Sequence, residues 1–215
     1  MMILSAEVVG KTVPVGIPNV KTATEFVAYM ARVSSPKNQV ENLRSKELVA
    51  YLIRNKHWSP LEMISFDLEF EAPRDISRQI IRHASARFQE FSQRYAEPQK
   101  FTVRELRRQD SKNRQNSIDD FSEEEKAEFR EDCEQAIAEA RGRYDKWIRR
   151  GAAKECARVF LPEGLTMSRL YMAASARTWI HYLDVREGNG TQLEHILVAK
   201  AARAALSKEE PDLFG

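Results

Sequence analysis

The sequence of 215 residues predicts an α+β fold in which helices outnumber strands. Residues 63–71 alternate strictly between polar and apolar side chains, which is typical of a half-buried strand. Ser122 and Glu125 form the S-x-x-E pattern of a capping box, which predicts the start of a long helix that extends to Arg149. The length is ordinary for one domain, so we expect residues 1–215 to share a single core.

The other elements follow from periodicity and from residues that start or stop them. An opening strand is expected over residues 2–15, where Gly16 and Pro18 end it. Helices are predicted, in chain order, over residues 22–33, 45–55, the first half of 74–98, 152–160, 177–185 and 191–206, the last of them capped by Thr191. The remaining expectations are a strand over 101–106, a loop over 107–117, a segment of ambiguous period from 167, and a frayed tail over 207–215.

Composition excludes several broad classes. The formal net charge is only +2, which argues against a general nucleic-acid binder. Residues 1–14 do not have the pattern of a signal peptide, and no apolar run approaches the ~20 residues that cross a bilayer. Cys133 and Cys156 form no C-x-x-C motif, and we interpret both as buried small apolar residues. These features indicate a cytoplasmic protein with no membrane partner.

The window of residues 74–98 has the densest set of chemically useful side chains. Its first half places Ile76, Ile80 and Ala84 on one stripe that we expect to be buried. The other faces then carry two further pairs at a spacing of four residues, Arg78 with Arg82 and Gln79 with His83. Such a helix could offer guanidinium, imidazole and amide groups to a planar or anionic ligand. The alternative is a solvated basic helix whose arginines pair with nearby acids.

The order of residues in this window resembles the signature R-H-R-x-x-S-x-N-E-x-S-x-R-Y of the flavin-dependent thymidylate synthases. The matching residues are Arg82, His83, Glu90, Ser92, Arg94 and Tyr95. Ala84 replaces the second Arg of the signature, which helps to hold the flavin in that family. Arg87, three residues further on, is our hypothesis for the side chain that takes over this role.

Four more segments extend the resemblance along the chain. Residues 57–62 resemble an H-x-[ST]-P-[FL]-E segment, and residues 157–162 resemble A-R-x-x-L-P. Residues 175–182 resemble N-A-R-S-L-x-x-F, with Ser175 in place of the Asn. Asp184-Val185-Arg186 and residues 191–194 resemble an L-R…A-Q-x-E ending. Each segment alone is a weak signal, but five in the right order are a strong one.

The resemblance implies a mixed or antiparallel sheet and the reductive methylation of dUMP to dTMP. Methylenetetrahydrofolate would donate the carbon, NADPH the electrons, and FAD would carry the hydride. A homotetramer with shared active sites is also implied. The implied FAD-binding residues are His57, Ser59, Arg82, His83, Ala84, Glu90, Ser175, Arg177 and His181. The implied dUMP-binding residues are Gln79, Arg82, Glu90, Ser92, Gln93, Arg94, Arg158 and Arg186.

The implied roles within this set differ. Arg186 is the catalytic candidate, because a guanidinium beside the uracil edge stabilises the negative charge that develops there. Ser92, Arg94 and Arg158 can donate to the phosphate, and Gln79 can read the uracil edge through its paired donor and acceptor. The histidines have no metal-ligand spacing, so no metal is expected, and His195 is interpreted as a helix-face residue.

Two alternatives remain open. An enzyme of the same fold could make another 5-substituted pyrimidine nucleotide, for example one with a hydroxymethyl group. A homologue without catalysis could bind a nucleotide or RNA, with Trp58, Phe88 and Tyr95 stacking on bases.

Overall fold

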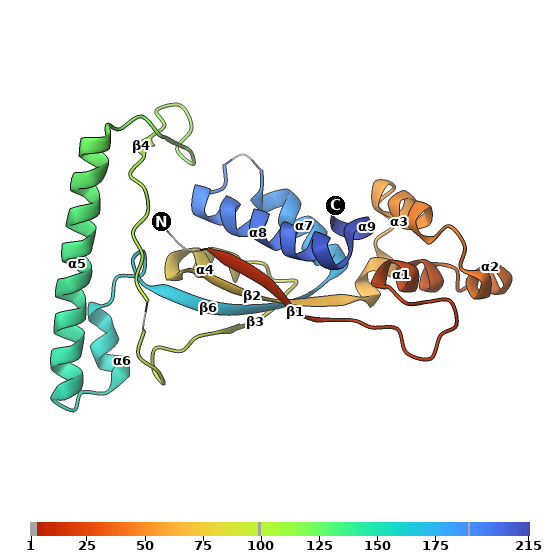
Figure 1. The fold of residues 1–215 in the computed structure, drawn as a ribbon, viewed down its shortest axis with the longest axis horizontal. Coiled ribbons are helices and arrows are strands. Elements are labelled where there is room, and N and C mark those ends of the chain that lie inside the picture. Colours follow the sequence, from red (N-terminus) through yellow and green to blue (C-terminus); the bar gives the residue numbers. More distant parts are fainter. Residues whose placement is uncertain (1–3, 99, 189) are drawn as a thin grey trace.

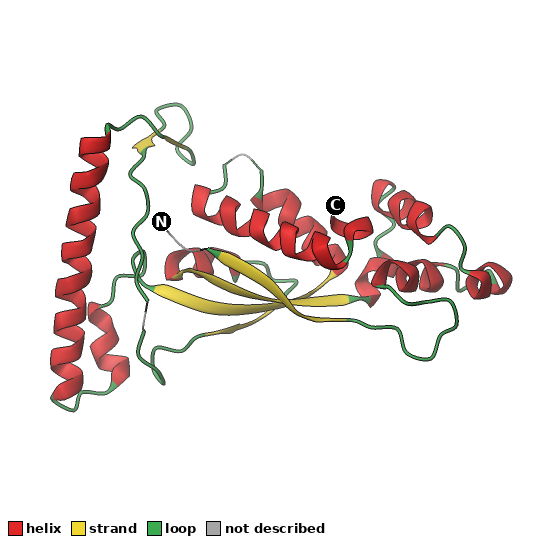
Figure 2. Cartoon of the chain, viewed as in Figure 1, coloured by secondary structure: helices red, strands yellow, loops and turns green. Residues whose placement is uncertain are grey.

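The computed structural model describes residues 4–98, 100–188 and 190–215, and its centre is a twisted sheet of order β1-β2-β6-β3 (Figures 1 and 2). The strands are β1 (Ser5–Lys11), β2 (Ser65–Pro73), β3 (Arg87–Glu90) and β6 (Met167–Ser175). Every neighbouring pair in this sheet is antiparallel. The predicted fold class, with an antiparallel sheet and several helices, is confirmed.

One face of the sheet is covered by α7 (Ala176–Arg186) and α8 (Leu193–Glu209), as Figure 1 shows. Phe66, Leu68 and Phe70 of β2 point into this core and are fully buried, because the strand alternates with a period of two. The ambiguous segment after residue 167 is a strand, β6, with the same alternation, and the helix predicted over 177–185 is α7.

At one end of the sheet lie α1 (Ala23–Ala31), α2 (Pro36–Glu41), α3 (Ser45–Arg54) and the 3-10 helix η1 (Ser59–Met63), as in Figure 1. Thr22 and Glu25 form a capping box at α1. The prediction placed only a helix stop at Pro36. In the structure Pro36 is instead the first residue of α2, a position that tolerates its missing N–H group.

At the other end stands α5 (Glu123–Arg149), whose capping box between Ser122 and Glu125 is confirmed, followed by α6 (Lys154–Ala157) and η2 (Arg158–Phe160). The strand expected over 101–106 is wrong, since only Phe101 bridges to Thr166. The expected loop contains parts of a small hairpin, β4 (Arg108–Gln109) and β5 (Ser117–Ile118).

Cys133 is only partly buried and Cys156 is exposed, so both were wrongly interpreted as buried.

The prediction of a frayed tail is also wrong. Helix α8 continues to Glu209, and α9 (Pro211–Phe214) folds back so that Phe214 is 1% exposed. The buried carboxylate of Glu210 accepts hydrogen bonds from the backbone N–H groups of Ala23 and Thr24 at 3.1 and 3.3 Å. The tail therefore supplies the acceptor that the first turn of α1 needs.

The helix at the start of the signature window is shorter than its periodicity predicts. Helix α4 (Arg74–Ile80) buries Ile76 and Ile80 completely, but it ends before residue 84. Ala84 is exposed in the turn that follows, so its expected place on the buried stripe is wrong. No helix in the described ranges is long and apolar enough to cross a membrane.

Candidate active site

The turn between α4 and β3 runs beside α7 and brings the centre of the signature against that helix. His83 in this turn contacts Arg186 and Tyr182, and Ser85 lines a cavity with Arg177. Because α4 ends at Ile80, the chain leaves the helix and passes along α7. The early end of α4 is thus what brings these residues together.

A cavity of about 310 Å³ opens where η1 meets α7. Its lining residues are Trp58, Glu62, Ser85, Arg177, Thr178, Ile180, His181 and Asp184. Glu62 accepts hydrogen bonds from Ser175 Oγ at 2.6 Å and from Arg177 at 2.8 Å, and the Ser175 bond is the main cause that lowers the pKa of Glu62. The ionised carboxylate holds the Arg177 guanidinium at the edge of the cavity.

His83 and Arg186 form the most specific polar pair near this cavity. Arg186 donates from Nε to Nε2 of His83 at 2.9 Å, so Nε2 has no proton and the ring is neutral. Burial is the main cause that lowers the pKa of His83 to about 4, and the positive charge of Arg186 adds to it. Nε is committed to His83, and within the described residues the terminal nitrogens of Arg186 make no hydrogen bond. They remain donors for an anionic or carbonyl ligand.

His195 lies on helix α8, as the sequence suggested, but it has polar contacts that its sequence position did not reveal. It is fully buried, and Nε2 lies 3.2 Å from the hydroxyl of Tyr182 while Nδ1 lies 3.2 Å from Oε1 of Gln79. Burial is the main cause that lowers the pKa of His195 to about 3, and the positive charge of Arg186 adds to it. The imidazole is neutral near pH 7 and links α7 to α4.

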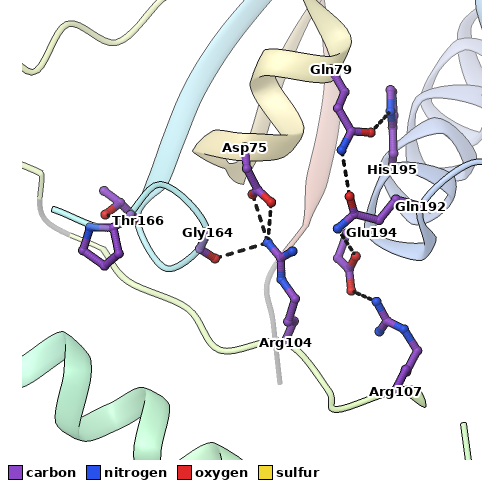
Figure 3. A network of polar contacts seen from close by, with 10 residues as sticks. Asp75, Gln79, Arg104, Arg107, Gly164, Thr166, Gln192, Glu194 and His195 are labelled. Atoms are coloured by element: carbon purple, nitrogen blue, oxygen red, sulfur yellow. Dashed lines mark hydrogen bonds and ion pairs between the residues drawn. The ribbon is translucent and has the colours of Figure 1, made fainter. Parts of the chain in front are cut away.

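Gln79 continues this chain of contacts toward the N-terminus of α8 (Figure 3). Its Nε2 donates to Oε1 of Gln192 at 2.7 Å, and Gln192 donates to Glu194 at 2.8 Å. Glu194 is 1% exposed and accepts from Arg107 at 2.6 Å. Half of the hydrogen-bonding capacity of the Gln79 amide is therefore used within the chain, and one N–H and one lone pair remain for a ligand.

A second group of polar residues surrounds Glu90 at the end of β3. Its carboxylate accepts from Arg78 and from Ser168 Oγ, each at 3.0 Å, and Arg74 lies 3.6 Å away. The Arg74 guanidinium is buried, and burial is the main cause that lowers its pKa. The positive charges of Arg78 and Arg158 lower it further. A second carboxylate, Glu163, lies 3.7 Å from Arg74 and 3.6 Å from Arg78, so these two arginines face two acids.

The other predicted site residues are distributed over both ends of the sheet. The exposed residues among them are His57, Ser59, Arg82 and Arg94. His57 packs edge-on against Tyr51, and Arg94 pairs with Glu155 at 3.0 Å. Ser92 accepts from the backbone N–H of Arg94 at 3.3 Å, and Gln93 is buried beside it.

The two halves of the predicted site are far apart within one chain. Phe91 pairs with Arg169 near the start of β6, while Ser175 ends that strand. Six residues of strand span roughly 20 Å. The structure thus groups Gln79, His83 and Arg186. A neighbouring group consists of Ser175, Arg177 and His181. Ser92 and Arg94 do not reach this cavity.

Several residues of the site were missed by the sequence reasoning. Glu62 closes the H-x-[ST]-P-[FL]-E segment, so that motif already contained the signal for it. Glu194 likewise ends the Q-x-E segment. Arg107 and Tyr182 carried no signal, because their roles depend on contacts with distant parts of the chain. Among the described residues, no cluster of three or more His, Cys, Asp or Glu could hold a metal ion.

Comparison with known proteins is consistent with this arrangement. Residues 17–212 match the profile of the family described as "Thymidylate synthase complementing protein". The chain belongs to the flavin-dependent thymidylate synthase family. A probable flavin-dependent thymidylate synthase of Paramecium bursaria Chlorella virus 1 is 43% identical over 211 residues, which cover 98% of this chain and 97% of that relative.

Two further comparisons extend the family assignment. A flavin-dependent thymidylate synthase of Synechocystis sp. is 46% identical over 186 residues, covering 86% of this chain and 85% of its own. A crystal structure of the UMP/dUMP methylase PolB from Streptomyces cacaoi, bound with 5-Br dUMP, superposes with a TM-score of 0.83 at 26% identity. The superposition covers 100% of this chain and 94% of the methylase.

Proposed function

We propose that this chain catalyses the flavin-dependent reductive methylation of dUMP to dTMP, with methylenetetrahydrofolate as carbon donor and NADPH as reductant. The observation that carries the proposal is the pair of His83 and Arg186. A neutral imidazole accepts from Nε of the guanidinium and leaves the terminal N–H groups of Arg186 available, beside the turn whose Ser85 lines a cavity with Arg177. Family membership supplies the reaction class for this arrangement.

The residues around the cavity fit part of a flavin. Arg177, Ser175 and Thr178 offer donors, Trp58 and His181 offer flat faces, and Glu62 fixes the arginine. FAD would supply hydride chemistry that no side chain provides. The cavity volume of about 310 Å³ is at the lower end of the ~300–1,000 Å³ that hold drug-sized ligands, so one protomer encloses only part of such a cofactor.

The chain's own residues have distinct roles toward dUMP. Arg186 faces the uracil edge and stabilises the negative charge that develops when C5 becomes nucleophilic. Gln79 contributes its remaining N–H and lone pair to the same edge. Arg82, Glu90, Gln93, Ser92, Arg94 and Arg158 complete the proposed nucleotide site, and the arginines supply charge-assisted donors to the phosphate.

A homotetramer with shared sites would reconcile these roles with the distances. The phosphate candidates Ser92 and Arg94 and the flavin candidates Ser175 and Arg177 lie at opposite ends of β6 in one protomer. Mixing inactive R94A and R177A proteins should restore activity, because a mixed oligomer contains sites with one intact copy of each half. Mixtures that stay inactive, or a monomer by light scattering, would contradict shared sites.

The spectroscopic test uses the purified protein loaded with FAD. Anaerobic addition of NADPH should bleach the visible flavin absorbance, and dUMP should change the rate of that bleaching. A protein that does not retain added FAD would refute the proposal. The substrates are small molecules, and we propose a cytoplasmic location without nucleic-acid partners.

UMP is a second candidate substrate. The structural neighbour that acts on UMP as well as dUMP superposes over the whole chain, and it has also been crystallised with 5-Br UMP. Parallel turnover of UMP and dUMP tests this possibility directly. We expect dUMP to be preferred, in line with the named function of the relatives of higher identity.

A further inference from the structure

The chain of hydrogen bonds that ends at Gln79 begins at a buried ion pair. Glu194 accepts from Arg107 at 2.6 Å and from Gln192 at 2.8 Å. Burial alone would raise the pKa of Glu194, but the hydrogen bonds from Arg107 and Gln192 outweigh it and the pKa is lowered. Glu194 is therefore ionised near neutral pH, and an ionised carboxylate can only accept hydrogen bonds.

This charge determines the orientation of every group that follows. Gln192 must turn its NH2 group to Glu194, so its Oε1 faces Gln79. Gln79 must then donate from Nε2 to Gln192 and present Oε1 to His195. His195 is neutral and has one ring proton, which must be on Nδ1. Nε2 is left to accept from the hydroxyl of Tyr182.

We infer that Glu194, held by Arg107, is a positioning residue that fixes the Gln79 amide in the one orientation that reads uracil and rejects cytosine. This inference rests on the proposed function, in which Gln79 faces the pyrimidine. Uracil presents the O4 acceptor beside the N3–H donor, whereas cytosine presents the N4 amino donor beside a bare N3 acceptor. An amide free to rotate by half a turn could match either base, and a fixed amide matches only one.

The position of the chain supports this role. Tyr182, which contacts His195, also packs edge-on against His83 with ring centroids 4.9 Å apart. His83 in turn accepts from Arg186, the group proposed to face the uracil edge. Arg107 belongs to the extended segment after Phe101, which carries no motif of its own. A second arginine of this segment, Arg104, binds both oxygens of Asp75 on α4 at 2.9 Å and is separate from the amide chain (Figure 3).

The experiment measures dissociation constants of dUMP and dCMP for the flavin-loaded enzyme by calorimetry. Glu194→Gln replaces the obligate acceptor by a group that can also donate, and Gln192→Met interrupts the chain at a half-buried position. Each variant should lower the preference for dUMP over dCMP by about tenfold or more, because sites with fixed hydrogen-bonding groups owe their selectivity to them. Asp75→Asn is the matched control, since it loosens the same segment without touching the amides, and its preference should stay unchanged.

Nitrogen NMR of the histidines gives a second readout that does not depend on nucleotide binding. His195 should show the Nδ1–H tautomer in the unmodified enzyme and in D75N, and should lose that single form in Q192M and E194Q. If E194Q does not fold, the Q192M variant alone tests the inference. An unchanged preference in Q192M, or an equal loss in D75N, would overturn the inference. Failure to bind either nucleotide while His195 keeps its tautomer would overturn the proposed function instead.

Discussion

Arg186 and His83, 103 residues apart in sequence, are joined by one hydrogen bond of 2.9 Å from Nε to Nε2. This bond fixes the ring as a neutral acceptor and holds the guanidinium beside the turn that follows α4. Exchange for lysine keeps the charge but removes the fork of donors. We expect R186K to lower kcat for dTMP formation by about 10²–10³-fold, the loss typical of a removed charge-stabilising donor.

The same variant should retain its flavin, because Glu62 and Arg177 are untouched. R203K is the matched control, since Arg203 pairs with Glu187 at the same end of α7 and makes no contact with His83. An R186K enzyme with unchanged kcat would contradict the role of Arg186.

Flavin affinity should depend on the carboxylate of Glu62. Glu62→Gln removes the ionic component of the interactions with Ser175 and Arg177, so Arg177 is no longer held at the cavity edge. Hydrogen bonds to charged groups contribute roughly 1.5–3 kcal/mol, and we expect the dissociation constant for FAD to rise about tenfold or more. Fluorescence titration measures it. Glu69→Gln, on the sheet face opposite the core, should leave the affinity unchanged.

Ala84 and Arg87 offer a test of the altered signature. Arg87 is exposed on β3, two residues after the cavity-lining Ser85. If Arg87 binds the flavin in place of the arginine that the signature has at position 84, Arg87→Ser should weaken FAD binding, whereas Gln89→Ser on the same strand should not. Equal FAD affinities of R87S, Q89S and the unmodified protein would refute this hypothesis.

The stability of the protein should fall with acid because of its buried histidines. The pKa values of His83 and His195 are lowered from the ordinary 6.5 to about 4 and about 3. Below pH 6.5 the unfolded chain binds these protons and the native state does not, so the free energy of unfolding decreases as pH falls toward 4. Each histidine contributes a slope of up to about 1.4 kcal/mol per pH unit in that window.

Urea unfolding between pH 7 and pH 4 checks this slope. His195→Gln should flatten it, and the exposed control His57→Gln should leave it as it is. A slope that H195Q does not reduce would show that His195 is not buried as a neutral ring.

The C-terminal tail should contribute to stability. Phe214 packs edge-on against Phe66 of β2 with ring centroids 5.2 Å apart. Phe214→Ala should lower the free energy of unfolding by about 3–5 kcal/mol, as for other buried aromatic residues. Val9→Ala, at a position 54% exposed, should change it by less than about 0.5 kcal/mol. Similar urea midpoints for the two variants would mean that the tail is frayed after all.

Periodicity predicted the elements in which one face is buried and the other is not. Strand β2 and the start of α5 were found from their own residues, because alternation and a capping box are local signals. Three features depended on distant contacts and could not be found in this way. They are the end of α4 at Ile80, the ordered tail, which rests on Phe66, and the burial of His195 between Tyr182 and Gln79.

The candidate site shows the same division. The motifs named His83, Arg177 and Arg186, which the structure brings to one region. They could not show that Ser92 and Arg94 lie at the far end of β6, since order along a chain does not determine distance in space. Arg107 lies in a segment without a motif, and only its contact with Glu194 identifies it.

The most direct measurement is the mass of the nucleotide formed when the FAD-loaded enzyme is incubated with dUMP, methylenetetrahydrofolate and NADPH. The proposed chemistry predicts dTMP, with a methyl group at C5. A 5-hydroxymethyl product, or unchanged dUMP from an enzyme whose flavin NADPH reduces, would contradict it.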